Sequence, residues 1–288
     1  MSPEQLLSGA VIPIDKPRGW TSFQAVGKVK GAIRQAFGLN AKLKVPVPSP
    51  NGRDAATCEQ HTLKIGHAGT LDPLATGLLL ICVGKATKTI PQLQDGDKVY
   101  TGTIVLGATT PCYDLERPID SYYPYEHITQ QLVETAAAQL TGTIMQVPPM
   151  FSAVKVDGQR AYQYARQGDP SVTIQPKAVN VYSFDITAFR QPSGDGAATT
   201  PDVRSTASDA TPSHHLYLHP LGEVPAHLPQ VDFRIHCGKG TYIRSLARDL
   251  GAALGSGAFL AALRREKIGP YTIDQALQFN EVASFLSA

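Results

Sequence analysis

The stretch 231-VDFRIHCGKGTYIRSLARDLGAALG-255 holds the clearest strand and the clearest helix in this chain of 288 residues. Its first part alternates between apolar and polar residues, as in a half-buried strand, and the apolar members are Val231, Phe233, Ile235 and Cys237. A turn with two glycines follows at 238–240. The remainder predicts a helix whose apolar face is made of Ile243, Leu246, Leu250 and Leu254.

Other segments predict further strands and helices without strict alternation. Strands are expected in 10-AVIPIDK-16, in the apolar run 77-GLLLICVG-84 and in the β-branched run 98-KVYTGTIVLG-107. Helices are expected after Thr21 or Ser22, over 129–140, and within 158-GQRAYQYARQG-168. This mixture favours an α+β fold over a doubly wound parallel sheet.

Two of these helices carry an apolar stripe at helical spacing. The first stripe, with lysines on the opposite helix face, is predicted to contain Phe23, Val26, Val29, Ile33 and Phe37. The second stripe, which stops at Gly142, is predicted to contain Ile128, Leu132, Ala136 and Leu140.

Two segments lack such a pattern. Residues 38–62 mix Pro, Gly, Asn and small polar residues, which favours an excursion from the core. Residues 191–229 are dense in Ser, Thr, Pro, Gly and Asp, a composition typical of a flexible surface insert. Both are expected to be inserts in one larger domain.

Composition places the chain among globular proteins. Hydrophobic residues make up 42% and charged residues 17% of the sequence, and no apolar run approaches the length of a bilayer span. Without a signal-peptide pattern, the expected location is the cytoplasm. The four cysteines lie far apart with no C-x-x-C pair, so buried thiols are expected instead of a zinc or redox motif.

The net charge of +2 hides two basic clusters. Residues 1–47 contain seven Lys or Arg residues against Glu4 and Asp15. The second cluster consists of Lys239, Arg244, Arg248, Arg264, Arg265 and Lys267. Either cluster could contact a polyanion, but each taken alone could equally be a solvated helix face.

The stretch 64-KIGHAGTLDP-73 places one carboxylate, Asp72, between a glycine-rich loop and a proline. Most often an Asp before Pro only initiates a turn. Metal binding would need more ligands than His67, and the group His214, His215 and His219 lies in the low-complexity insert, so no metal is expected. A glycosidase would need a second acid near Asp72, and 238-GKGT-241 does not match a phosphate-binding P-loop.

Six separated motifs, in this order, make the chain similar to the bacterial tRNA pseudouridine synthase B family. They are 15-DKPRGWTS-22, 66-GHAGTLDPLATGLLLICVGKATK-88, 97-DKVY-100, 148-PPMFSAVKVDGQRAYQYARQG-168, 240-GTYIRSLARDLG-251 and 263-LRR-265. The second is long and specific, and the set spans nearly the whole chain.

This resemblance implies a pseudouridine synthase fold, with a mixed, mainly antiparallel sheet flanked by helices and loops. It implies one catalytic domain over 10–275, an RNA-gripping arm around 146–180, and a tail over 276–288 in place of the PUA domain that many relatives carry. The inserts 38–62 and 191–229 are longer than the family core requires, which leaves the RNA footprint open.

The resemblance also assigns roles to individual residues. It makes Asp72 the catalytic carboxylate, Arg244 the active-site arginine, and Tyr100 the aromatic residue on the target base. His67 matches the residue that fills the place of the flipped base, and Tyr242 and Leu263 match residues lining the base pocket. Phosphate contacts are expected from Lys16, Lys155, Arg160 and Arg166.

The implied activity is isomerisation of the T-loop uridine at position 55 of tRNA, without cofactor or metal. The expected partner is the T-stem and loop of tRNA, with no membrane and no protein partner, and the chain is expected to be a monomer. Two other hypotheses remain: a tRNA-folding chaperone with incidental catalysis, and an Asp-dependent nucleoside hydrolase. The point of attack, at the sugar C1′ or the base C6, or removal of a ribose proton first, stays open.

Overall fold

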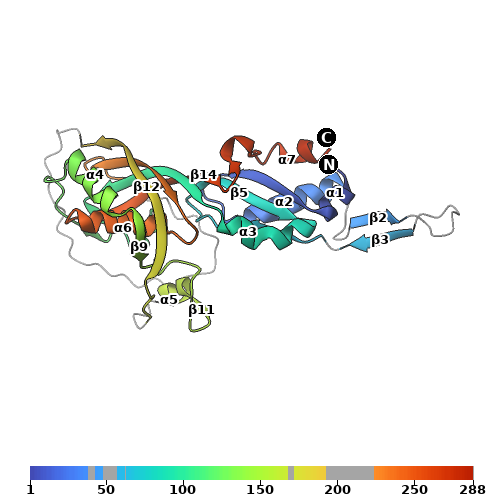
Figure 1. Ribbon diagram of the computed structural model, residues 1–288, viewed down its shortest axis with the longest axis horizontal. Coiled ribbons are helices and arrows are strands. Elements are labelled where there is room, and N and C mark those ends of the chain that lie inside the picture. Colours follow the sequence, from blue (N-terminus) through green and yellow to red (C-terminus); the bar gives the residue numbers. More distant parts are fainter. Residues whose placement is uncertain (38–42, 48–56, 62, 168–171, 193–223, 288) are drawn as a thin grey trace. The chain divides into compact units, whose positions relative to one another are not determined.

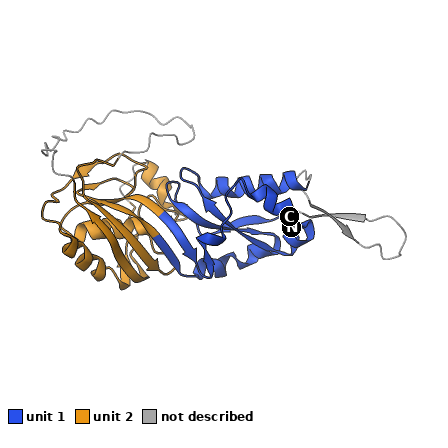
Figure 2. Cartoon of the chain, turned by 90° about the horizontal axis from the view of Figure 1, so that it is seen from above, with its two compact units in different colours: residues 1–100, 264–288 blue, residues 101–263 orange. Residues whose placement is uncertain are grey.

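The computed structural model describes residues 1–37, 43–47, 57–61, 63–167, 172–192 and 224–287. The chain divides into two compact units, coloured separately in Figure 2. Unit 1 comprises residues 1–100 and 264–288, and unit 2 comprises residues 101–263. Unit 1 is therefore built from both ends of the chain, whereas unit 2 is continuous.

The sheet of unit 1 is centred on β5 (Thr76–Val83), which is the apolar run predicted as a strand. It pairs antiparallel with β1 (Ala10–Lys16) and with β4 (Ile65–Ala68). The second half of β14 (Ala258–Ile268) pairs parallel with β5 and antiparallel with β15 (Tyr271–Thr272). Every residue from Leu78 to Val83 is fully buried, which explains the continuous apolar run without alternation.

Helices cover this sheet. In chain order they are α1 (Pro3–Ser8), α2 (Ser22–Ala36), the 3₁₀ turn η1 (Gly84–Thr89), α3 (Ile90–Asp95), the 3₁₀ turn η2 (Ile273–Gln275) and α7 (Val282–Ser287). Helix α2 contacts β4 and α7. The two ends of the chain meet, because the Met1 ammonium group donates a hydrogen bond to the Leu286 carbonyl at 3.0 Å (Figure 1).

Helix α2 begins where the sequence predicts, with a capping box between Thr21 and Gln24. Its buried residues include Val29 and Ile33, as predicted. Phe23, however, was assigned wrongly to this face, since it is 83% exposed. The hydroxyl of the preceding Ser22 turns inward and hydrogen-bonds both the N–H and the carbonyl of Leu71, which leaves Phe23 on the solvent side.

The sheet of unit 2 has the strand order β14–β6–β13–β12–β9. Its members are the first part of β14, β6 (Lys98–Leu106) from Thr101 onward, β13 (Gln230–Cys237), β12 (Lys177–Arg190) and β9 (Gly142–Gln146). Strand β13 buries the four alternating apolar residues that predicted it, each to within 1% exposure. The fold is thus mixed and mainly antiparallel, as expected.

Helix α6 (Ile243–Ala253) follows β13, and its predicted apolar face is buried. Helix α4 (Gln130–Gln139) packs on β12 and contacts α6, as Figure 1 shows. Leu132 was assigned wrongly to the core face of α4, because it is 46% exposed. The buried residues Val133, Ala136 and Ala137 lie on the side that meets β12 and α6, so the face is rotated by about one residue.

Small strands complete unit 2. Strands β7 (Ala108–Thr109) and β8 (Ser121–Tyr122) pair, as do β10 (Lys155–Val156) and β11 (Gln159–Arg160). The β10–β11 turn has positive φ at Asp157 and Gly158, as a tight hairpin requires. Helix α5 (Ala161–Gln167) follows, so the helix predicted in 158–168 starts only after β11 ends. Figure 1 shows α5 and β11 projecting from the sheet of unit 2.

The first predicted insert contains β2 (Leu43–Val47) and β3 (Thr57–His61), which form a two-stranded sheet of their own. This agrees with an excursion from the core. Its other residues, and residues 193–223 of the second insert with His214, His215 and His219, lie outside the described residues.

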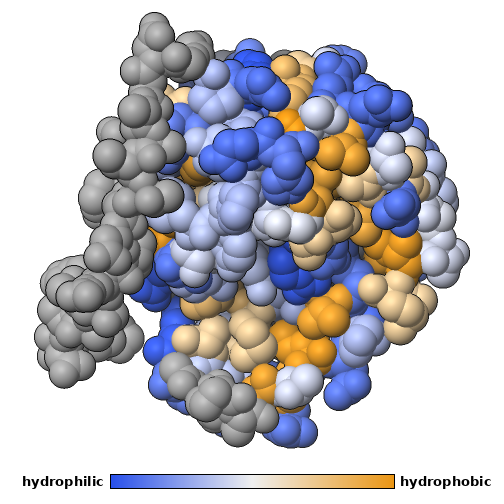
Figure 3. Space-filling view, turned by 90° about the vertical axis from the view of Figure 1, so that its left-hand side faces the viewer, coloured by the Kyte–Doolittle hydropathy of each residue, from blue (hydrophilic) through white to orange (hydrophobic). Residues whose placement is uncertain are grey.

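The three cysteines whose side chains the structure describes are buried, free thiols, as the sequence suggested. Burial raises the pKa of Cys82 to about 11 and, together with Asp114, the pKa of Cys112 to about 12. Such thiols are poor nucleophiles at neutral pH. Among the described residues, no helix is long and apolar enough to span a membrane. On the face seen in Figure 3, hydrophobic residues form patches interspersed with hydrophilic ones.

Replacing Leu80 by Ala tests the core of unit 1. Leu80, on β5, is fully buried in a hydrophobic cluster with Ala68, Leu78, Cys82 and Ile268. Its replacement by Ala should therefore lower the free energy of unfolding by about 2–5 kcal/mol. The matched control is Phe23→Ala at an 83% exposed position, which should change stability by less than about 0.5 kcal/mol. Urea unfolding followed by circular dichroism measures both, and equal losses would contradict the assignment of the core.

Candidate active site

Asp72 lies in the loop between β4 and β5 of unit 1. The Asp72 carbonyl accepts a hydrogen bond from the Ala75 N–H at 3.1 Å, which closes a turn with Pro73 at its second position. On the other side of Asp72, the Ser22 hydroxyl holds Leu71 by 2.9 Å and 3.1 Å hydrogen bonds. Asp72 therefore does begin a turn, and that turn fixes the backbone from which its carboxylate projects.

Lys16, the last residue of β1, is fully buried. Its ammonium group donates to the carbonyls of Pro17, Trp20 and Pro73 at 3.0, 2.7 and 3.2 Å. The 17–20 turn is thereby tied to the loop of Asp72. This differs from the solvent-exposed phosphate contact that the sequence suggested for Lys16.

The charge state of Lys16 changes within the range of pH in which enzymes are usually assayed. Burial lowers the pKa of its ammonium group to about 8, the nearby Asp72 carboxylate opposes that shift, and Arg265 adds to it. Lys16 is therefore mostly protonated at neutral pH and loses its charge as the pH rises through about 8. The positive charge that interacts with Asp72 depends on pH.

Arg265 is a second buried cation at this loop, and it was missed as a site residue from sequence. It is 1% exposed on β14, and its donors reach the carbonyls of Leu78, Gly69 and Thr70 at 2.8, 3.0 and 3.4 Å. A Cβ on Gly77 would lie 2.4 Å from the Arg265 carbonyl, so only glycine permits this approach of β5. The 263-LRR-265 motif carries no local sign of burial, which only the strand pairing reveals.

His67 and Tyr100 also belong to unit 1. His67 lies on β4, half-buried, and its Nδ1 is buried without a hydrogen-bond partner among the described residues. Burial and the Arg265 charge hold the pKa of His67 below its usual range, so the ring is neutral at neutral pH. Tyr100 lies on β6 and is 8% exposed.

The candidate residues of unit 2 centre on the first turn of α6. The side-chain amide of buried Gln146 accepts from the Tyr242 N–H at 2.8 Å and donates to the Tyr242 carbonyl at 3.1 Å. Tyr242 is the N-cap residue, and Arg244 is the second residue of the helix. Strand β9 thus fixes where α6 begins and the direction in which the Arg244 side chain projects from the helix.

Arg244 is 4% exposed, and its guanidinium group donates to the Cys112 and Phe151 carbonyls at 3.1 and 3.0 Å. Its Nε lies 3.6 Å from the carboxylate of Asp114, which is equally buried. A cation near a helix N-terminus is unfavourable, because the helix dipole is positive there. Asp114, which sequence reasoning missed, offsets this cost and fixes the orientation of the guanidinium group.

The predicted phosphate-binding residues of the arm are exposed. Lys155 and Arg160 lie on the β10–β11 hairpin, where Arg160 donates to the Ala153 carbonyl at 2.7 Å. Arg166 on α5 lies over the Tyr162 ring, 5.1 Å from its centre. Leu263, on β14, is partly exposed.

Only part of the second basic cluster lies at the surface, where Lys239 is exposed. Arg244 and Arg265 are buried, and Arg264 is bonded bidentately to Asp15 at 2.8 and 3.0 Å. Arg248 pairs with Asp249 at 2.7 Å. These charges serve mainly to organise the fold around the site.

The structure thus brings together Lys16, Arg265 and the loop of Asp72 in unit 1, which also holds His67 and Tyr100. Unit 2 holds Arg244, Tyr242, Leu263 and the arm residues. No group of three or more His, Cys, Asp or Glu side chains is placed to hold a metal ion within the described part of the chain.

Comparison with protein families identifies two matches. Residues 57–207 match the N-terminal domain of the TruB family of pseudouridylate synthases. Residues 244–287 match a C-terminal domain of tRNA pseudouridylate synthase B. The first match contains Asp72, and the second contains Arg244 and Arg265.

Full-length relatives agree. The chain is 43% identical over 277 residues to tRNA pseudouridine synthase B of Flavobacterium johnsoniae, covering 96% of each chain. It is 38% identical over 280 residues to the enzyme of the same name from Parabacteroides distasonis, covering 97% of this chain and 94% of that one.

Solved structures share the fold. A Cbf5–Nop10–Gar1 complex matches with a TM-score of 0.57 and 22% identity, over 98% of this chain and 55% of that chain. An H/ACA ribonucleoprotein bound to a substrate RNA containing 2′-deoxyuridine matches with a TM-score of 0.54 and 20% identity, over 99% and 56%. This chain spans about half the length of those chains. The family match and the full-length relatives show that the chain belongs to the TruB family of pseudouridylate synthases, which are isomerases.

Proposed function

We propose that this chain converts the T-loop uridine of tRNA to pseudouridine, with Asp72 as the nucleophile. The observation that carries this proposal is the construction of the Asp72 loop, in which two buried cations and a serine hydroxyl fix the backbone around one carboxylate. Full-length relatives named tRNA pseudouridine synthase B support the choice of substrate.

The reaction exchanges one glycosidic bond for another. The bond between uracil N1 and the ribose C1′ breaks, the base rotates, a bond forms between C5 and C1′, and the C5 proton is lost while N1 gains one. A covalent adduct of Asp72 with the ribose C1′ or the base C6 divides this exchange into easier steps, and Asp72 leaves unchanged. No electrons are gained or lost overall, so the reaction needs no redox partner.

For this chemistry the carboxylate must stay ionised beside an uncharged base. Desolvation by the bound nucleotide favours the protonated acid, and a nearby positive charge opposes that effect. Lys16 supplies such a charge from within unit 1. Arg244 is proposed to supply the second charge from unit 2 when the nucleotide is bound, since its guanidinium group is already fixed in place.

The remaining site residues are proposed to hold the base. The target uridine must leave its stack, which costs a few kcal/mol, before Asp72 can reach it. Tyr100 stacks on the flipped base and is the candidate acceptor of the C5 proton. Tyr242 and Leu263 line the base pocket. Neutral His67 occupies the place in the RNA that the flipped base leaves. An uncharged, half-buried imidazole suits that place between bases.

The arm is proposed to contact the T-stem. Lys155, Arg160 and Arg166 are exposed, so they are available to phosphates. Contacts of this kind release counterions, and binding should therefore weaken steeply as salt increases.

The Asp72→Asn variant tests the nucleophile. It should abolish pseudouridine formation in an unmodified tRNA transcript, with a loss of at least about 10³-fold, because an amide cannot form the adduct. The measurement is primer extension after carbodiimide treatment, which stops at pseudouridine. Asp274→Asn, an exposed acid in the same unit, is the control and should retain full activity. Equal stops with both variants would refute the proposal, and an inactive variant that still refolds tRNA would separate catalysis from a chaperone role.

The pH profile tests Lys16. Because the Lys16 ammonium group loses its proton as the pH rises through about 8, kcat/KM should fall about tenfold between pH 7 and pH 9. In Lys16→Arg the charge persists to above about pH 12, so this descending limb should disappear whatever the absolute rate. The same limb in both proteins would show that another group titrates.

Two variants at positions one helical turn apart on α6 test whether the site requires the guanidinium group of Arg244. Arg244→Lys removes the contacts to two carbonyls and should lower kcat by at least about 100-fold, since one ammonium group cannot span them. Arg248→Lys, at a partly buried position that pairs with Asp249, is the matched control and should cost no more than a few-fold. Single-turnover rates on the transcript measure both, and equal effects would argue against a special role for Arg244.

A further inference from the structure

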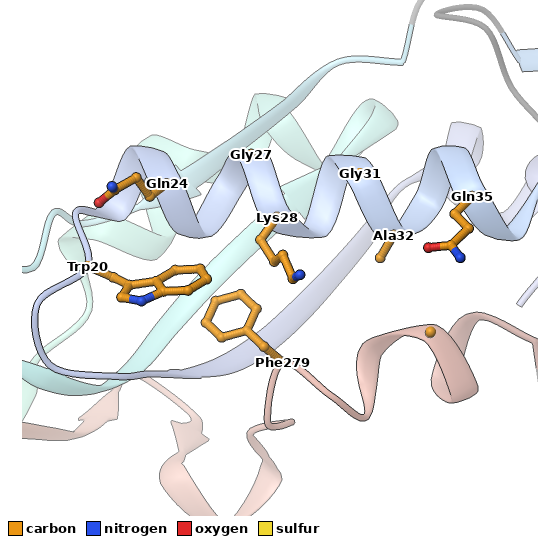
Figure 4. Close-up of a pocket in the computed structure, with 9 residues that line it drawn as sticks. Trp20, Gln24, Gly27, Lys28, Gly31, Ala32, Gln35 and Phe279 are labelled. Atoms are coloured by element: carbon orange, nitrogen blue, oxygen red, sulfur yellow. The ribbon is translucent and has the colours of Figure 1, made fainter. Parts of the chain in front are cut away.

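Unit 1 contains an open groove of about 610 Å³ along α2, which no part of the proposed chemistry uses (Figure 4). One wall is α2, and the other is made by Phe279, which precedes α7, and by Ala283 at the start of α7. At one end the rings of Trp20 and Phe279 stack, with centres 4.9 Å apart and an angle of 29° between the planes. The side chain of Lys28 extends toward Phe279 in Figure 4.

Two glycines keep the groove open. Gly27 and Gly31 lie in the middle of α2, where glycine weakens a helix relative to alanine. Neither is required for packing, because a Cβ built at either position meets no atom within 4 Å. They leave the helix backbone accessible along the groove, which suits a large ligand lying against it.

The charge of the groove suits a polyanion. Among the described residues that line the groove, Lys28 is the one charged side chain, and helix α2 as a whole carries Lys28, Lys30 and Arg34 and no acidic residue. On the facing segment, the Glu281 carboxylate accepts a hydrogen bond from the Gln278 N–H. Aromatic rings beside a cation are the combination with which proteins bind bases and phosphates of unpaired nucleic acid.

One end of the groove, at Trp20, is tied through its backbone to the Asp72 loop. The Lys16 ammonium group bridges the carbonyls of Trp20 and Pro73, and Ser22, the first residue of α2, bonds Leu71. From there α2 extends over 15 residues, or about 22 Å. An RNA strand with one nucleotide at Asp72 can therefore continue along this helix.

We propose that the α2 groove binds the substrate RNA beyond the target uridine, with one base against the Trp20–Phe279 pair and a phosphate at Lys28. The inference rests on the proposed function, since it assigns the groove to the same RNA. The groove thus lengthens the footprint on unit 1 without adding to the chemistry.

The chain offers its own probe, because Trp20 is its single tryptophan. Unmodified tRNA transcript is titrated into the Asp72→Asn protein while tryptophan fluorescence is recorded. Stacking of a base should quench the signal. Lys28→Glu and Gly31→Leu, in that background, should raise the Kd about five- to tenfold, and Lys28→Glu should lower the salt slope by about one. Gly31→Leu fills the groove at a position with room for a side chain.

Matched controls are Lys88→Glu, an exposed lysine on η1, and Ala36→Leu, at the exposed end of the same helix. Both should bind tRNA as the parent protein does. Unchanged binding by both groove variants, or equal losses in the controls, would overturn the inference. So would quenching by poly-glutamate equal to that by RNA, or a groove-dependent dimer in sedimentation, since these would assign the groove to an acidic protein or to a second copy.

Activity separates the two proposals. With Asp72 intact, the groove variants should raise the KM for tRNA and leave kcat unchanged. A parent protein that forms no pseudouridine would refute the proposed function. A parent that is active while groove variants keep its KM would refute the groove alone.

Discussion

The site depends on a few buried cations that hold backbone carbonyls instead of carboxylates. Lys16 binds three carbonyls around the Asp72 loop, and Arg265 binds three more from Gly69, Thr70 and Leu78. Burying an ammonium or guanidinium group is costly unless its donors are satisfied. Here the donors of both cations are satisfied by backbone carbonyls, and these hydrogen bonds hold the Asp72 loop in place.

Unit 2 also buries a cation, Arg244, and stabilises it partly with a carboxylate. Arg244 sits where the α6 dipole disfavours a cation, and the buried Asp114 carboxylate with two carbonyls makes the position tenable. Gln146 fixes the start of the same helix through the backbone of Tyr242. Each unit therefore presents its charged group from a backbone that neighbouring strands hold in place.

Local patterns in the sequence predicted much of the fold. The alternation in β13, the apolar run of β5 and the cap of α2 each depend on neighbouring residues, and all three were predicted correctly. Phe23 and Leu132 were misplaced, since long-range contacts decide which face of a helix turns inward. The same holds for Lys16, Asp114 and Arg265, whose partners lie up to 196 residues away. Motif resemblance located Asp72, but not the residues that hold its loop.

The division of the chain also bears on how the protein is made. Residues 101–263 form a continuous unit, whereas residues 1–100 are completed by residues 264–288, which are synthesised after that unit. Arg265 belongs to that late segment, and until it emerges from the ribosome the carbonyls of Gly69 and Thr70 lack their donor. A nascent chain can thus fold its second unit before its first, and the Asp72 loop acquires its final setting only after unit 2 has been synthesised.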